Sequence, residues 1–144
     1  MKIVIVGGVA GGASAAARIR RLDENAQVIV FERTGYMSYA NCGLPYYIGG
    51  TIQDKGDLTL QNPDSFWDRF IVDVRILHEV TDIDPANKTV IVKNLESGKV
   101  YEESYDKLLL SPGAKPTRPD MTGIDNDKIF TLRTVEDTLR IEEY

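Results

Sequence analysis

Residues 7–12 (Gly-Gly-Val-Ala-Gly-Gly) contain four glycines and constrain the fold more than any other feature of the chain. The cluster follows a β-branched run at residues 2–6, which predicts a strand buried on both faces. A small-residue stretch with arginines in its last turns comes next and predicts a helix over residues 11–23. A second apolar run at residues 27–32 completes a βαβ unit, whose strands we expect to be parallel and joined by a right-handed crossover.

The glycine cluster lies between a strand and a helix, which is the context that a dinucleotide-binding turn requires. Gly7 permits the sharp bend, backbone N–H groups approach a pyrophosphate at the helix N-terminus, and Gly12 lets the helix pack closely on the strand. Glu32 ends the second strand within reach of a ribose, which favours an adenosine with a free 2′-hydroxyl, as in FAD or NAD. The match is incomplete, because Val9 takes the place of the second glycine, and a plain strand–helix turn is the alternative.

Three further helices are predicted from their end signals. Residues 41–48 form a short helix with Asn41 as its N-cap, and residues 63–70 form another with Asn62 as its cap and a proline in its first position. A last helix begins at Thr134 and carries acidic residues in its first turn.

The second half of the chain changes to short alternating strands. Residues 74–80, 88–93 and 100–104 are separated by turn signals and predict an antiparallel meander. Residues 105–111 predict one more buried strand, which enters a Pro-Gly pair. The expected fold class is therefore α/β, with a Rossmann-like βαβ unit in a parallel sheet and an added antiparallel meander.

Composition excludes several functions. One cysteine among 144 residues excludes internal disulfides and multi-cysteine metal sites, and we expect no metal centre. A net charge of −5 argues against a nucleic-acid partner. No apolar run approaches the roughly 20 residues that span a bilayer. We expect a cytoplasmic protein; the apolar run after Lys2 resembles a secretory signal peptide only superficially, because glycines break it.

Cys42 is the single thiol of the chain, and two interpretations of it compete. A lone cysteine is most often a small buried hydrophobic residue. In the first turn of a short helix, however, the helix dipole stabilises a thiolate, and hydrogen-bonding residues surround this position. Without a second cysteine, a redox cycle must pass through a mixed disulfide, persulfide or sulfenic acid formed with an external molecule.

Five segments together resemble the pyridine nucleotide-disulfide oxidoreductases. They are residues 7–18, 31–33 (Phe-Glu-Arg), 38–46 (Ser-Tyr-Ala-Asn-Cys-Gly-Leu-Pro-Tyr), 108–114 (Leu-Leu-Leu-Ser-Pro-Gly-Ala) and 130–134 (Phe-Thr-Leu-Arg-Thr). Within the family, they are similar to the single-cysteine branch, which contains coenzyme A disulfide reductases and NADH-dependent persulfide reductases.

The resemblance implies an FAD-dependent enzyme in which NAD(P)H reduces the flavin, the flavin reduces Cys42, and Cys42 attacks a disulfide or persulfide sulfur. It implies that residues 1–117 are the first segment of an FAD-binding domain, and that residues 118–144 lead toward an NAD(P)H-binding domain absent from this sequence. The implied substrate is a small-molecule thiol disulfide or persulfide, of coenzyme A type among others, and the implied assembly is a homodimer.

The resemblance also implies roles for single residues. The catalytic residue is Cys42, and the substrate-binding residues are Ser14, Arg18, Arg21, Ser38 and Asn41. The cofactor-binding residues are Gly7, Gly8, Val9, Ala10, Gly11, Gly12, Glu32, Arg33, Val80, Ser111, Pro112 and Gly113.

The chain departs from the family pattern at Phe70, where coenzyme A disulfide reductases can carry a substrate-binding lysine, and this leaves room for a persulfide or polysulfide. Tyr46 and Tyr47 are interpreted as packing residues and His78 as structural. Two alternatives remain: an NADH oxidase or peroxidase that uses a cysteine sulfenic acid, and a non-catalytic nucleotide-binding module in which Cys42 is buried and inert.

Overall fold

The computed structural model describes residues 1–144, which form two compact units. The first unit contains Met1–Ser38 and Gln61–Pro112, and the second contains Tyr39–Leu60 and Gly113–Tyr144. The expected division at residue 117 concerns functional domains and stays a prediction.

A parallel sheet forms the centre of the first unit. It contains β1 (Lys2–Val6), β2 (Gln27–Phe31), β3 (Asp73–Arg75) and β7 (Lys107–Leu110), in the order β3-β2-β1-β7. Every pair in this sheet is parallel, and β1 lies between β2 and β7. Helix α1 (Ala10–Leu22) connects β1 to β2, so the predicted βαβ unit is confirmed.

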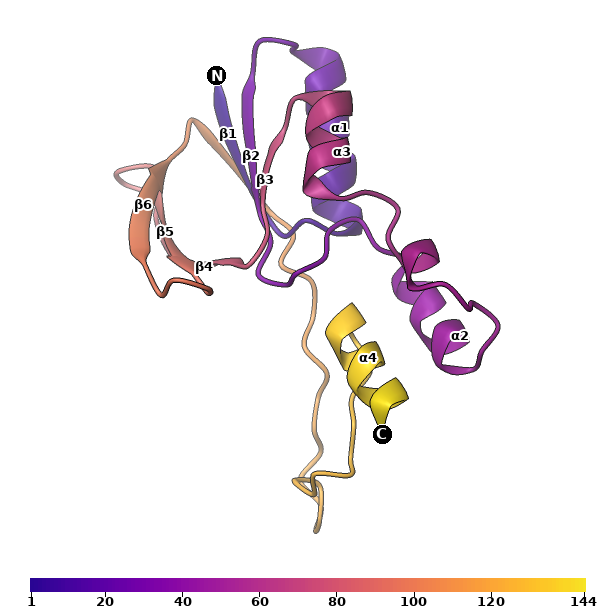
Figure 1. Cartoon of the computed structure of the whole chain (residues 1–144). Helices are drawn as coiled ribbons and strands as arrows, with labels where there is room; N and C mark the ends of the chain where they lie inside the picture. The colour runs from indigo at the N-terminus through magenta and orange to yellow at the C-terminus, as the bar shows by residue number, and fades with distance from the viewer. The chain divides into compact units, whose positions relative to one another are not determined.

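The two faces of the sheet carry different layers (Figure 1). Ile3, Ile5 and Val30 point into a core that also contains Ala16 of α1 and Phe66 of the helix α3 (Pro63–Phe70). The alternate residues of the same strands form the other core, against the three-stranded sheet. Both faces of β1 and β2 are therefore covered, which explains why these strands are apolar throughout.

The second core joins the parallel sheet to the meander. Val4, Ile29 and Phe31 pack there with Val90 and Val92, and all five side chains are buried. The meander contains β4 (His78–Asp84), β5 (Thr89–Asn94) and β6 (Val100–Ser104), paired antiparallel in that order. The predicted fold class is thus confirmed.

The prediction of one strand over residues 74–80 was wrong. The chain bends between β3 and β4, where Leu77 adopts a left-handed backbone with φ of +55°. The first half of the segment pairs with β2 in the parallel sheet, and the second half opens the meander. No glycine or proline marks this bend, and the only trace of it in the sequence is the pair Ile76-Leu77, where two consecutive apolar residues interrupt the alternation.

Capping explains the ends of two helices. The side chain of Asn62 accepts a hydrogen bond from the Ser65 N–H at 2.8 Å, and the Ser65 hydroxyl in turn accepts one from the Asn62 N–H. Thr134 and Asp137 form the same reciprocal arrangement at α4 (Val135–Glu143) of the second unit. The predicted starts of both helices are confirmed.

The cysteine-bearing segment of the second unit differs from its prediction. Residues Asn41–Gly43 form a 3₁₀ turn (η1) that leads into α2 (Leu44–Ile48), and Lys55–Leu58 form a second such turn (η2). Asn41 is not a cap, because it lies inside the turn and neither η1 nor α2 has a side-chain cap. Across the whole chain, no helix is long and apolar enough to cross a membrane.

Candidate functional site

The turn between β1 and α1 has no room for side chains at two of its glycines. Gly7 has φ of +96°, and a Cβ there would lie 2.1 Å from the carbonyl oxygen of Ser111. A Cβ on Gly12 would lie 1.7 Å from the carbonyl oxygen of Gly7. Gly8 and Gly11 are less constrained, because their nearest neighbours would lie at 3.1 Å. The backbone of strand and helix therefore approaches most closely at Gly7 and Gly12.

The N-terminus of α1 is open toward an anion. Its N-cap is Val9, which offers no side-chain hydrogen bond, and the first turn carries no acidic residue. The N–H groups of residues 10–12 have no carbonyl partner within the helix, since the first helical bond runs from Ala13 to Val9. These donors and the positive end of the helix dipole suit a pyrophosphate.

Glu32 is buried beside this turn and is held by three hydrogen bonds. Its Oε2 accepts from the Gly8 N–H at 2.7 Å, and its Oε1 accepts from the N–H and the hydroxyl of Thr34, both at 2.9 Å. Only 5% of Glu32 is exposed. The Gly8 N–H thus points at this carboxylate. Thr34 could not be identified from the sequence, because its contact depends on a turn geometry that leaves no mark in the residue pattern.

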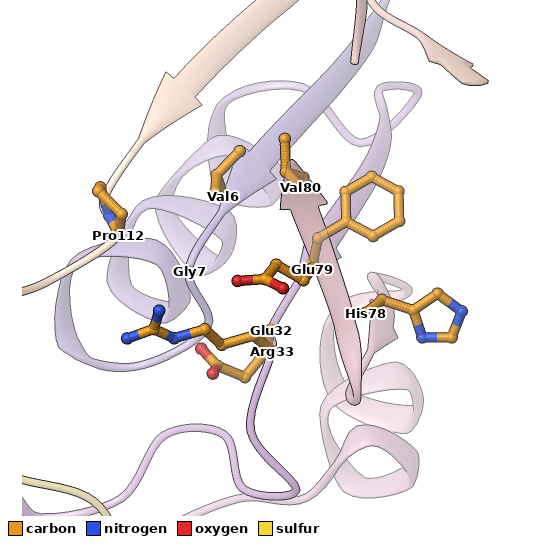
Figure 2. Close-up of a pocket in the computed structure, with 9 residues that line it drawn as sticks. Val6, Gly7, Glu32, Arg33, His78, Glu79, Val80 and Pro112 are labelled. Atoms are coloured by element: carbon orange, nitrogen blue, oxygen red, sulfur yellow. The ribbon is translucent and has the colours of Figure 1, made fainter. Parts of the chain in front are cut away.

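A cavity of about 100 Å³ opens where the carboxyl ends of β1 and β2 meet the start of β4 and the end of β7 (Figure 2). Ligands of open α/β sheets bind at this edge. Five residues assigned to the cofactor from the sequence line the cavity together, namely Gly7, Glu32, Arg33, Val80 and Pro112. The remaining lining residues are Val6, Phe31, His78 and Glu79.

The side chain of His78 is held by two hydrogen bonds and also lines the cavity. Its Nδ1 donates to the carbonyl oxygen of Ile76 at 2.7 Å, and its Nε2 accepts from the Asn94 amide at 3.2 Å. Its ring lies 6.4 Å from that of Phe31 and also borders the cavity. The two-residue spacing between His78 and Val80 on one strand is the signal that could have indicated this, because alternate residues share a face.

The segment after β7 closes the glycine turn. The Ser111 hydroxyl donates to the carbonyl oxygen of Val6 at 3.0 Å and lies 3.3 Å from that of Gly7. The Ser111 N–H also donates to Val6, at 2.8 Å. Pro112 lines the cavity, whereas Gly113, with φ of +74°, belongs to the second unit.

The residues assigned to the substrate divide between the two units. Ser14, Arg18 and Arg21 are exposed, and their spacing places them on one face of α1. Ser38 closes the first unit with φ of +46°, and Asn41 lies in the second. Their meeting at one site stays a prediction.

Two other positions near α1 have structural roles. Arg20 donates to the carbonyl oxygens of Phe70 and Ile71 at 2.7 and 2.8 Å, which joins α1 to the end of α3. The Phe70 ring packs against that of Phe66, with centroids 4.7 Å apart, and against the core beneath α1. Phe70 therefore contributes to packing.

Cys42 is an exposed free thiol in η1 of the second unit. The backbone around it is anchored, because the Gly43 N–H donates to Ala40 at 2.9 Å and Gly43 and Leu44 are both buried. The helix that follows Cys42 has only five residues, whereas the sequence predicted a helix over residues 41–48. The helix dipole that would stabilise a thiolate is therefore weaker than expected. The interpretation of Cys42 as a buried, inert residue assumed burial, and the exposure of the thiol contradicts that assumption.

The two tyrosines after the cysteine behave differently. Tyr46 is 59% exposed, so its interpretation as a packing residue was wrong. Tyr47 is half-buried on α2, which packs against α4. Partial burial and a hydrogen bond with Glu142 raise the pKa of the Tyr47 hydroxyl above its ordinary value.

These features define a nucleotide-binding α/β unit and a second unit with one exposed thiol. The chain belongs to the pyridine nucleotide-disulphide oxidoreductase family, whose model matches residues 1–144. That family is FAD-dependent. The glycine turn, the open helix N-terminus and the buried Glu32 fit the pyrophosphate and a ribose hydroxyl of this cofactor.

The relatives are reductases of sulfur compounds and an oxidase. The chain is 45% identical to a coenzyme A disulfide reductase of Staphylococcus haemolyticus (strain JCSC1435), and the match covers 99% of the chain and 32% of the relative. It therefore spans about a third of the length of the curated relatives that it matches.

Solved structures match over the same range. Reduced Bacillus anthracis CoADR-RHD superposes with a TM-score of 0.97 at 53% identity, over 99% of this chain and 26% of that one. An NAD-dependent persulfide reductase from A. fulgidus gives 0.93 at 36%, over 99% and 26%. A water-forming NADH oxidase from Lactobacillus brevis bound to NADH gives 0.92 at 32%, over 99% and 32%.

Proposed function

We propose that this chain supplies the first FAD-binding segment and the redox cysteine of an NAD(P)H-dependent disulfide or persulfide reductase. Residues 1–117 would form the FAD-binding segment, and residues 118–144 would lead toward a nicotinamide-binding domain. The observation that carries the proposal is the exposed Cys42 on an anchored turn. The same chain carries the glycine turn at residues 7–12 and the buried Glu32, which we call the nucleotide cradle. By analogy with the family, the whole protein would act as a homodimer.

The nucleotide cradle would hold FAD through its own backbone. The N–H groups of residues 10–12, which have no carbonyl partner within the helix, would donate to the pyrophosphate, and Gly7 and Gly12 keep the turn narrow. Glu32 would accept a hydrogen bond from a ribose hydroxyl, and Val80 and Pro112 border the cavity from β4 and from the end of β7. Bound FAD supplies the transfer of two electrons from NAD(P)H to sulfur.

Cys42 would act as the nucleophile. Its thiolate attacks one sulfur of a disulfide, so a bond forms from Cys42 to that sulfur, and the substrate S–S bond breaks. The departing thiolate takes up a proton and leaves as the first thiol. Two electrons that originate from NAD(P)H then cleave the mixed disulfide, which releases the second thiol after protonation and restores the Cys42 thiolate. A persulfide substrate follows the same sequence and releases sulfide in place of one thiol.

Charge on α1 supports an anionic substrate. Arg18 and Arg21 are exposed with Ser14 on one face of the helix, and we assign these three residues with Ser38 and Asn41 to substrate binding. Phe70 offers no positive charge, since a phenyl ring has no ionisable group, and the ring is part of the core packing. A persulfide or polysulfide is therefore a candidate electron acceptor, as coenzyme A disulfide is.

The second candidate is an NADH oxidase that cycles Cys42 through a sulfenic acid. The similarity to the Lactobacillus brevis oxidase favours it. The stretch Asn-Cys-Gly-Leu-Pro-Tyr at residues 41–46 favours the reductase, because it resembles the single-cysteine reductase branch.

Replacing the thiol tests the proposed function. In the full-length protein, Cys42→Ser should retain FAD, because it leaves Gly7, Gly12 and Glu32 unchanged, and should lose both disulfide and persulfide reduction. Flavin absorbance measures the first property, and acceptor-dependent NAD(P)H oxidation measures the second. Unchanged turnover of both substrates would show that Cys42 is not the nucleophile.

A further inference from the structure

Thr34 makes two of the three hydrogen bonds that hold the Glu32 carboxylate. Its N–H and its Oγ1 both lie 2.9 Å from Oε1 of Glu32, while the Gly8 N–H lies 2.7 Å from Oε2. Glu32 is buried, so water does not readily replace a missing donor. Thr34 therefore determines where one carboxylate oxygen lies, and Gly8 determines the other.

The proton of the Thr34 hydroxyl has two acceptors within reach. Oε1 of Glu32 lies 2.9 Å from Oγ1, and the carbonyl oxygen of Tyr36 lies 3.0 Å from it. A hydrogen bond to an ionised acceptor is about twice as strong as one between neutral groups. The Tyr36 N–H approaches the same Oγ1 from 3.4 Å and can use its acceptor side. The proton is therefore best placed on the bond to Glu32.

Counting lone pairs shows what this arrangement leaves for a ligand. Each oxygen of an ionised carboxylate accepts about two hydrogen bonds. Both donors of Thr34 fill the capacity of Oε1, whereas the Gly8 N–H occupies half the capacity of Oε2. One acceptor position remains on Glu32, on the oxygen that also contacts the glycine turn.

The backbone keeps this arrangement in register. The Thr34 carbonyl oxygen accepts from the Leu77 N–H at 3.1 Å, and the Glu32 carbonyl oxygen accepts from the His78 N–H at 3.0 Å. The stem of Glu32 also packs closely on Gly8, where a Cβ would meet it at 3.1 Å. The Glu32–Thr34 turn is thus bound both to the start of the meander and to the nucleotide turn.

We infer that Thr34 is a positioning residue for the nucleotide: it saturates Oε1, so that Glu32 presents a single acceptor on Oε2 beside the glycine turn. This inference rests on the proposed function, in which Glu32 holds the ribose of FAD. Glu32 then accepts from one ribose hydroxyl, and the other hydroxyl requires a different partner. Because Oε2 also holds Gly8, the same atom aligns the ribose with the pyrophosphate-binding turn.

The test uses apoprotein of the full-length enzyme titrated with FAD, with the dissociation constant measured by flavin fluorescence. Thr34→Val keeps the side-chain shape and the N–H but lacks the hydroxyl proton, so FAD binding should weaken about tenfold. Thr34→Ser restores the hydroxyl and should restore the affinity. Thr138→Val is the matched control, because it removes a buried hydroxyl that donates to Thr134 at 3.0 Å in the second unit.

Hydrogen exchange gives a readout that needs no flavin. In the apoprotein, the Gly8 amide should exchange faster in Thr34→Val than in the parent protein or in Thr138→Val, because its acceptor is less firmly held. If Thr34→Val fails to fold, Thr34→Ala makes the same chemical change with less bulk and carries the same expectation. Equal exchange at Gly8 in the parent and in the hydroxyl-free variant would contradict the positioning role.

Glu32→Gln separates this inference from the proposed function. A dissociation constant that is unchanged in Thr34→Val, or equally weakened in Thr34→Ser, overturns the role of the Thr34 hydroxyl while leaving the FAD site intact. An unchanged dissociation constant in Glu32→Gln overturns the assignment of Glu32 to the ribose, and the inference about Thr34 fails with it.

Discussion

At the residue scale, the nucleotide turn depends on two positions where only a hydrogen fits. Gly7 lies against the carbonyl of Ser111, and Gly12 lies against the carbonyl of Gly7. These are also the two glycines to which the sequence pattern gives a geometric role. Gly8 and Gly11 face side chains at longer distances, so the four glycines of the cluster are not equivalent.

Gly12→Ala should therefore destabilise the chain strongly. Its Cβ would overlap the backbone of Gly7 at 1.7 Å, and helix and strand would have to separate. We expect a loss of about 3 kcal/mol in the free energy of unfolding, measured by urea denaturation. Gly11→Ala is the control, because its Cβ meets the Ser111 Cβ at 3.1 Å and the better helix propensity of alanine offsets part of the strain. Equal losses in the two variants would refute the close approach.

Part of the site could be predicted residue by residue. Gly7, Glu32, Val80 and Pro112 come from four separate segments, and they line one cavity. Residues at the carboxyl ends of parallel strands are expected to lie close together, because these ends share one edge of the sheet. Thr34 could not be found in this way, because its bonds to Glu32 depend on the dihedral angles of one turn.

At the element scale, the starts of the two helices with side-chain caps were predicted correctly, and the uncapped α1 was predicted to within one residue, whereas the start assigned to Asn41 was wrong. Asn62 and Thr134 cap their helices as expected, and each forms a reciprocal pair with the residue three positions later. Asn41 has the same residue type as Asn62 but lies inside a 3₁₀ turn. The bend at Leu77 escaped prediction because a leucine adopts the left-handed backbone there.

Removing the cap of α3 should cost a measurable part of the stability. Asn62→Ala removes the acceptor that holds the Ser65 N–H at 2.8 Å, and we expect a loss of about 1 kcal/mol in the free energy of unfolding. Asn62→Asp retains an acceptor at the same place and should behave like the parent chain. Chemical denaturation followed by circular dichroism measures both. A loss in Asn62→Asp as large as in Asn62→Ala would show that the cap bond is unimportant.

An ion-pair group connects the parallel sheet with the meander and makes stability depend on pH. Glu103 of β6 accepts from Arg75 Nη1 at 2.8 Å and pairs with Lys2 of β1. Burial raises the pKa of Glu103, but the hydrogen bonds from Lys2 and Arg75 outweigh this effect and hold the pKa below its ordinary value of 4.5.

The sign of the pH effect follows from this lowered pKa. A carboxyl group with a lower pKa in the folded state than in the unfolded state stabilises the fold above the unfolded pKa, and this contribution disappears as the pH falls through the folded value. The free energy of unfolding should decrease on acidification below about 4.5, and less steeply in Glu103→Gln than in the parent. Glu102→Gln, on the exposed face of the same strand, is the charge-matched control. Parallel curves for Glu103→Gln and the parent would contradict the role of this group.

At the scale of the whole molecule, the chain forms two units and spans 32% of the length of a curated relative. The nucleotide cradle lies entirely in the first unit and Cys42 in the second. The family and fold class were recognisable from five short motifs. The arrangement of cofactor, thiol and substrate residues in one site depends on more than these motifs determine.

The isolated chain should bind FAD more weakly than the full-length protein. The cavity beside the glycine turn measures about 100 Å³, which accommodates only part of a dinucleotide, and the chain spans only 32% of the length of a curated relative. Titration of both apoproteins with FAD, followed by flavin fluorescence, compares the two dissociation constants. Equally tight, stoichiometric binding by the isolated 144 residues would contradict this expectation.

The central claim is that Cys42 delivers electrons from NAD(P)H to the sulfur of a small molecule. Steady-state NADH and NADPH oxidation by the full-length protein, measured against coenzyme A disulfide, coenzyme A persulfide, polysulfide and oxygen, tests it most directly. If Cys42 is the nucleophile, at least one sulfur acceptor should be reduced much faster than oxygen. Rapid oxygen consumption with no stimulation by any sulfur acceptor would contradict it and would instead assign the protein to the oxidases.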